Sequence, residues 1–164
     1  MDEDIKQINK QENTMKTLFL TVAAAAGAVA VTAGAHAQDI PLDQVPSVVR
    51  NSFETAFPKA KDIDWEKEGA LYNVEFETGR RTDHEAWYDA SGKLVKHKQD
   101  ISRKELPSEV NRVIEREFKG YRVDDMEKIT AGTTTTYRLE LDSRRQDWII
   151  TVDANGKILD KTAD

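Results

Sequence analysis

The sequence predicts an α+β fold of two tandem helix-plus-antiparallel-meander repeats, with the helices packed on one face of an antiparallel sheet. Three patterns predict it, each occurring twice and in the same order: a helical stripe, an alternating strand and an Asp-x-x-Gly turn. We expect repeats over residues 38–101 and 102–164, joined in one compact domain. A unit of roughly 60 residues is only marginally able to bury its sheet alone, which favours two joined units.

The helical pattern begins each repeat. The segment VPSVVRNSFETAF from Val45 aligns with LPSEVNRVIEREF from Leu106. Apolar residues spaced by four form one stripe of a helix. Pro46 and Pro107 stand at the expected helix starts, where a missing N–H is tolerated. The matching apolar positions are Val49, Phe53 and Phe57 in the first segment and Val110, Ile114 and Phe118 in the second.

Alternating strands follow each helix. YNVEFET alternates from Tyr72 and YRLELDS from Tyr137, and this period of two indicates antiparallel strands with one buried face. The second copy has extra residues before its strand, and we expect the Thr-rich stretch at residues 131–136 to hold them as a longer loop. HEAWYD and WIITVD form a further strand pair and run into the turns.

The two turns read Asp89-Ala90-Ser91-Gly92 and Asp153-Ala154-Asn155-Gly156. An Asp carboxylate at the first position accepts a hydrogen bond from the backbone N–H two residues on, and Gly at the fourth tolerates a positive φ. The strands LVKHK and ILDKT then return. This architecture leaves the other face of the sheet open.

The first 37 residues are predicted to lie outside the fold. From Met15 a lysine, an apolar run over residues 18–33 and Ala35-His36-Ala37 form the pattern of a secretory signal peptide, with cleavage expected after Ala37. The run is shorter than the ~20 residues of a membrane span, so an uncleaved anchor is the less favoured alternative. Residues 1–14 are expected to be a non-native upstream extension, with a long polar leader as the alternative.

The composition favours an exported protein that binds neither nucleic acid nor, after cleavage, a membrane. The 164 residues contain no cysteine, so the fold depends on its apolar core alone. Acidic residues outnumber basic ones by 30 to 24, whereas a nucleic-acid-binding protein needs a basic face.

The sequence carries no signature of an enzyme. It has no G-x-S-x-G, H-E-x-x-H, P-loop or G-x-G-x-x-G motif. Acid pairs such as Asp62/Asp64 and Glu75/Glu77 occur at strand spacing, but solvated outward positions explain them better than a metal site does. We therefore expect no catalytic residues, no metal and no cofactor. His84 has the parity of the core and is expected to be a packing or pH-sensitive residue.

The candidate binding residues lie on the open face of the predicted sheet. If Ala86 and Tyr88 face the helices, then Trp87 faces away, and tryptophan among charges is typical of a protein-recognition surface. The alternative is that Trp87 only covers the sheet by stacking on Arg138 or Arg81. Trp65 is expected to pack in the core or at an edge, just before the first strand. The candidate partner-binding residues are Trp87, Glu75, Glu85, Arg138, Glu140 and Ile149, with Arg80, Arg81 and Asp83 on an exposed hairpin tip.

AFPKAKDIDW, YNVEFE and EAWYDASGKLV, in that order, resemble the PepSY-like family of exported bacterial proteins, which is also described as beta-lactamase-inhibitor-protein-like. The resemblance covers nearly all of residues 42–164 in two copies, and the second copy has Met126 near the position of Trp65. It implies helices backing an antiparallel sheet, a periplasmic location and a non-catalytic role. The named inhibitor carries disulfides, which this chain lacks.

Two functions are consistent with these features. The first is a periplasmic protein-binding module whose open sheet face binds another periplasmic protein, and the family resemblance implies that it is a peptidase or hydrolase inhibitor. The alternative is a periplasmic sensor that binds a small ligand or cation through acidic residues of the same face.

Overall fold

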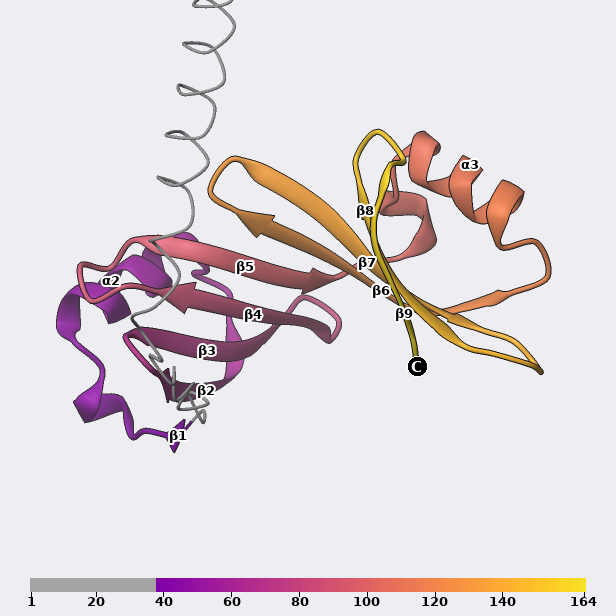
Figure 1. Ribbon diagram of the computed structural model, residues 1–164. Helices are drawn as coiled ribbons and strands as arrows, with labels where there is room; N and C mark the ends of the chain where they lie inside the picture. The colour runs from indigo at the N-terminus through magenta and orange to yellow at the C-terminus, as the bar shows by residue number, and fades with distance from the viewer. Residues whose placement is uncertain (1–37) are drawn as a thin grey trace, which may run out of the picture. The chain divides into compact units, whose positions relative to one another are not determined.

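The computed structural model describes residues 38–164, which form a nine-stranded antiparallel sheet with two α-helices (Figure 1). The strands lie in the sheet in chain order, each beside its neighbour in sequence. The expected signal peptide and upstream extension lie outside the described residues. In chain order the elements are β1 (Gln38–Asp39), α2 (Ser47–Ala56), β2 (Lys61–Glu68), β3 (Leu71–Thr78), β4 (Thr82–Tyr88), β5 (Leu94–Asp100), α3 (Ser108–Glu117), β6 (Arg122–Ala131), β7 (Thr134–Asp142), β8 (Trp148–Asp153) and β9 (Ile158–Ala163).

The two halves, residues 38–101 and 102–164, share one order of elements, except that the first half begins with the additional two-residue strand β1. Each contains a short 3-10 turn followed by a helix and four strands, and each helix follows directly on a proline, Pro46 or Pro107. The first hairpin of each half has a register shift at the same place, between Lys61 and Asp64 and between Val123 and Met126. The halves therefore share this register shift as well as the order of their helix and four following strands.

Both helices pack on the same face of the sheet. One row of register partners crosses the sheet from β3 to β8, so its side chains share a face: Phe76, His84, Gln99, Lys128, Tyr137 and Val152. Phe76 belongs to the apolar cluster under α2, and Tyr137 and Val152 belong to the cluster under α3. The predicted placement of the helices is confirmed.

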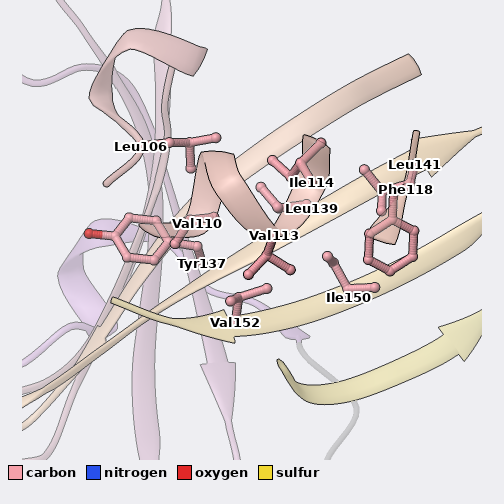
Figure 2. Close-up of a cluster of buried hydrophobic side chains, with 10 residues drawn as sticks. All are labelled: Leu106, Val110, Val113, Ile114, Phe118, Tyr137, Leu139, Leu141, Ile150 and Val152. Carbon is pink, nitrogen blue, oxygen red and sulfur yellow. The ribbon is translucent and has the colours of Figure 1, made fainter. Parts of the chain in front are cut away.

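Each half has an apolar core between its helix and its strands. Phe53 of α2 lies at the centre of the first, with ring centroids 5.0 Å from Phe76 and 5.3 Å from Trp65. Figure 2 shows the second, where the apolar side chains of α3 point toward those of β7 and β8. Its members are Leu106, Val110, Val113, Ile114, Phe118, Tyr137, Leu139, Leu141, Ile150 and Val152.

The two Asp-x-x-Gly turns attach the sheet to the helices. Asp89 Oδ1 accepts from the N–H of Ser91, and Asp153 Oδ1 from that of Asn155, as the sequence predicts. Gly92 and Gly156 have φ of +82° and +83°. A Cβ on Gly156 would lie 2.9 Å from the carbonyl oxygen of Glu109 in α3, and one on Gly92 2.8 Å from that of Val48 in α2. Glycine thus permits both the turn and the close approach of the helix.

The structure corrects two expectations about the strands. Thr134, Thr135 and Thr136 belong to β7, so the extra residues of the second half lengthen a hairpin and not a loop. The longer β6 pairs with β5 through residues 127–131 and so joins the halves. Trp65 lies inside β2, buried as expected but not ahead of the first strand. The strand KDIDWEKE has too few apolar residues to show a period of two.

Candidate functional site

The face of the sheet opposite the helices carries the candidate binding residues. Register places Glu75, Glu85 and Lys98 in one row on this face. Both α-helices of residues 38–164 lie on the other side, so neither covers this open face. Trp87, Arg138, Glu140 and Ile149 have the same parity and also lie on the open face, as predicted.

A ladder of alternating charges crosses the middle of the open face. Lys98 Nζ lies 2.7 Å from Glu85 and 3.4 Å from Glu127, and the Arg138 guanidinium lies 3.2 Å from Glu127 and 2.9 Å from Glu140. Burial alone lowers the pKa of Lys98, but hydrogen bonds and attraction to Glu85 and Glu127 raise it overall. Lys98 therefore stays charged and links the two halves.

Sequence reasoning missed Glu127, the most buried carboxylate of the ladder. Its residue is 8% exposed, and it contacts both Lys98 and Arg138. The strand around it, RVDDMEKITA, has no clear alternation, and its register shift breaks the parity. No signal in the sequence places Glu127 beside Arg138.

Trp87 lies on the open face, but its side chain is not the accessible aromatic that the sequence suggested. The residue is only 7% exposed. Its Nε1 donates a 2.7 Å hydrogen bond to Glu68, and Lys96 Nζ lies 3.7 Å from the ring centroid. The predicted alternative, stacking by Arg138 or Arg81, is also wrong in its detail, because a lysine covers the ring.

An acidic cavity of about 460 Å³ opens beside the ladder. Of its carboxylates, only Glu85 and Glu127 form ion pairs within residues 38–164. Burial and repulsion from Asp125, Asp83 and Glu127 raise the pKa of Asp100. Negative charge therefore accumulates here, and Lys98 compensates only part of it. The cavity is lined by Asp62, Asp64, Glu75, Phe76, Glu77, Asp83, His84, Glu85, Lys98, Asp100, Asp125 and Glu127.

The hairpin tip between β3 and β4 is exposed, as expected. Arg80 and Arg81 are exposed, and Arg81 has a φ of +64°. Asp83 lines the acidic cavity with Glu75 and Glu85, whereas neither arginine does. The structure thus brings together Glu75, Glu85 and Asp83 of the predicted set and leaves Glu140 and the two arginines apart from that cavity.

His84 and His97 form a stacked pair on the helix side of the sheet. His84 Nδ1 lies 3.1 Å from His97 Nε2, and Phe57, directly after α2, packs against both rings. Burial, followed by repulsion from His84 and Lys128, lowers the pKa of His97 to about 4. Burial also lowers the pKa of His84, partly offset by Asp83. The prediction of a packing or pH-sensitive His84 agrees with this position.

The histidine pair predicts a loss of stability in acid. In the unfolded chain the His97 imidazole is protonated below about pH 6.5, whereas in the folded protein it is protonated only below about pH 4. The free energy of unfolding should therefore decline as the pH falls through this window. After discounting for the partial exposure of the ring, His97 contributes about 1 kcal/mol of that decline at pH 5.

Urea unfolding at pH 7.5, 6.0 and 5.0 measures this effect. His97→Phe keeps an aromatic ring against Phe57 but removes the titrating group, so its stability should change less between pH 7.5 and 5.0. An equal decline in both proteins would show that His97 is not responsible.

Residues 38–164 contain no group of three His, Asp or Glu side chains arranged to hold a metal ion. Within the same residues, no helix has the length and hydropathy to span a membrane.

A family model described as "Putative beta-lactamase-inhibitor-like, PepSY-like" matches residues 31–96 and 70–160. The chain belongs to the PepSY-like family. No curated protein matches this PepSY-like chain.

Solved structures share the fold of this PepSY-like protein. A "putative periplasmic" protein from Bacteroides eggerthii is 18% identical, with a TM-score of 0.65 over 73% of this chain and 88% of its own. A DUF2874 family protein from Bacteroides uniformis is 18% identical, with a TM-score of 0.64 over 72% and 88%. A BLIP-like protein from Bacteroides fragilis is 16% identical, with a TM-score of 0.63 over 76% and 87%. At these identities the similarity establishes the fold.

Proposed function

We propose that this PepSY-like protein is a non-catalytic periplasmic module that binds another protein through its open sheet face. The observation that carries the proposal is the acidic cavity on a sheet face that neither helix covers. Its carboxylates repel one another in the free protein, and a bound partner with complementary charge relieves that repulsion. Inhibition of a peptidase or another hydrolase is the narrower form of this proposal.

The periplasmic location is supported by two observations. The sequence has the pattern of a cleavable signal peptide ending at Ala37, and a structural neighbour is described as "putative periplasmic". The family description and the lack of enzyme motifs in the sequence support a non-catalytic role.

The proposed contact residues are those predicted from the sequence, except that Trp87 becomes a supporting residue and not a direct contact. Glu75, Glu85, Asp83, Arg138, Glu140 and Ile149 lie on or beside the open face, with Arg80 and Arg81 at its rim. Trp87 supports this surface from beneath, because Glu68 and Lys96 cover its ring.

Site-specific photo-crosslinking in the native host tests the function. A benzoylphenylalanine probe at Glu77, in the acidic cavity, is expected to capture one defined partner. The same probe at Thr55, an exposed position on α2, is the control and should not capture it. Asp83→Lys should abolish the capture from Glu77, because it reverses charge in the cavity. Capture from Thr55 instead of Glu77 would contradict the proposal.

The carboxylate-lined cavity also favours the alternative, a sensor of cations or small ligands. The lack of a three-ligand metal cluster in residues 38–164 weighs against it. Calorimetric titration with calcium and zinc separates the two functions. We expect no saturable micromolar binding of either ion, and such binding would favour the sensor.

A further inference from the structure

The two halves of the protein carry the same pair of carboxylates on the open face, but only one pair has a cation. In the second half, Glu127 of β6 and Glu140 of β7 both contact the guanidinium of Arg138. Register pairs Glu127 with Arg138, and Glu140 follows two residues later on the same strand. In the second half, therefore, a guanidinium provides the positive charge for the two carboxylates.

In the first half, Glu66 and Glu75 occupy the equivalent positions around Asn73. Register pairs Glu66 of β2 with Asn73 of β3, and Glu75 follows two residues later. Asn73 is neutral and cannot replace the charge of Arg138. Its Nδ2 donates to Glu85, while its Oδ1 is buried without a partner in residues 38–164, and the residue is 3% exposed.

No other side chain of residues 38–164 supplies the missing charge. In the second half Lys98 of β5 also pairs with Glu127, but the corresponding strand beside Glu66 is β1, which brings a further carboxylate, Asp39. Neither Glu66 nor Glu75 forms an ion pair with a described residue. Partial burial and repulsion from Glu75, Asp39 and Glu85 raise the pKa of Glu66.

An apolar surface adjoins the unpaired carboxylates. Both line a cavity of about 650 Å³ with Leu42 and Ile63, which are 54% and 43% exposed, and with Trp65. Arg50 also lines this cavity, yet it forms no ion pair with Glu66 or Glu75.

The second half has polar contacts at the equivalent place, where a smaller cavity of about 390 Å³ lies. Arg103, at the position of Leu42 in its 3-10 turn, donates to Asn111 and lies 3.9 Å from Glu115. The first half therefore offers both a vacant cation position and exposed apolar surface.

We propose that Glu66 and Glu75 bind an arginine side chain of the partner protein, whose guanidinium takes the place that Arg138 holds in the second half. The aliphatic stem and a neighbouring apolar residue of the partner pack against Leu42 and Ile63. A guanidinium suits the site because its planar donors reach two carboxylates at once. This inference rests on the proposed function and names the chemistry of the partner.

A peptide-binding titration tests the inference. The fluorescence of Trp65, which lines the cavity, reports the binding. The probe is acetyl-Leu-Arg-Leu-amide, and its control carries citrulline, a neutral isostere, in place of arginine. The arginine peptide is expected to bind at least about tenfold more tightly than the citrulline peptide, and less tightly in high salt. Equal binding of the two peptides would overturn the inference.

Matched variants locate the site. Asn73→Arg supplies the cation internally and should lower the affinity for the arginine peptide by about tenfold or more. Glu140→Gln, in the half whose site is already occupied, should leave the affinity within about twofold. If Asn73→Arg does not fold, the double variant Glu66→Gln with Glu75→Gln makes the same test, with circular dichroism as the check on folding. Unchanged affinity in a folded variant of either kind would refute the site.

The outcomes distinguish this inference from the proposed function. If the probe at Glu77 captures a partner but Asn73→Arg leaves both the capture and the peptide affinity unchanged, the open face binds proteins without this arginine site. If the arginine peptide binds as expected but crosslinks arise from Thr55 alone, the arginine site stands and the proposed function falls.

Discussion

Trp87→Ala is expected to lower the free energy of unfolding by about 3 kcal/mol and the melting temperature by about 10 °C. The ring is 93% buried although it lies on the open face, since Lys96 and Glu68 cover it. Its removal exposes the sheet beneath, ends the hydrogen bond to Glu68 and leaves Lys96 without its aromatic partner. Thermal unfolding by circular dichroism measures the loss.

Two further variants separate the contributions. Trp87→Phe keeps most of the ring and loses the bond to Glu68, at a cost of about 1 kcal/mol. Ile149→Ala, a half-buried position on the same face, should also cost only about 1 kcal/mol. A melting temperature unchanged by Trp87→Ala would mean that the ring is accessible, and Trp87 would again be a direct contact for the partner.

Gly156→Ala is expected to destabilise the protein by a similar amount, about 3 kcal/mol. The new Cβ meets the Glu109 carbonyl oxygen at 2.9 Å and the Val113 side chain at 3.1 Å. The residue also has a φ of +83°, which alanine adopts only with strain. Relief of either problem requires the turn to move away from α3. Gly92→Ala should behave alike in the first half, because Val48 approaches equally closely.

Gly79→Ala is the matched control for both turn glycines. Gly79 has a φ of +57° but no atom within 4 Å of an added Cβ. This change should therefore cost only the backbone strain, about 1 kcal/mol. Urea unfolding of the variants separates the two effects, and equal losses at positions 79 and 156 would mean that helix contact is not what requires glycine.

The sequence predicts those parts of the fold that carry strong periodicity. The helix with Val49 and Phe53 and the strand YNVEFET each bury one regular face, so their periodicity is visible in the sequence. The paired Asp-x-x-Gly turns are recognisable by their residue types. Strands β2 and β6 are not predicted by the sequence, because charged residues dominate them and a register shift interrupts each one. The Thr-rich stretch reads as a loop because threonine is common in both loops and strands.

The candidate site is less predictable than the fold. Parity along each strand correctly places Glu75, Glu85 and Arg138 on the open face. It gives no information about which side chains cover one another, so the burial of Trp87 under Lys96 does not follow from it. The contrast between Asn73 and Arg138 becomes visible only after register shows that they occupy equivalent positions.

The strictly sequential order of strands β1 to β9 has a consequence for folding kinetics. Each strand pairs with its neighbour in chain order, so no connection crosses another, and only the β1–β2 and β5–β6 connections are long enough to contain a helix. Short hairpin closures cost less chain entropy than distant pairings and favour faster folding. A chain that emerges amino-terminus first can therefore complete its first helix and hairpins before the remainder appears.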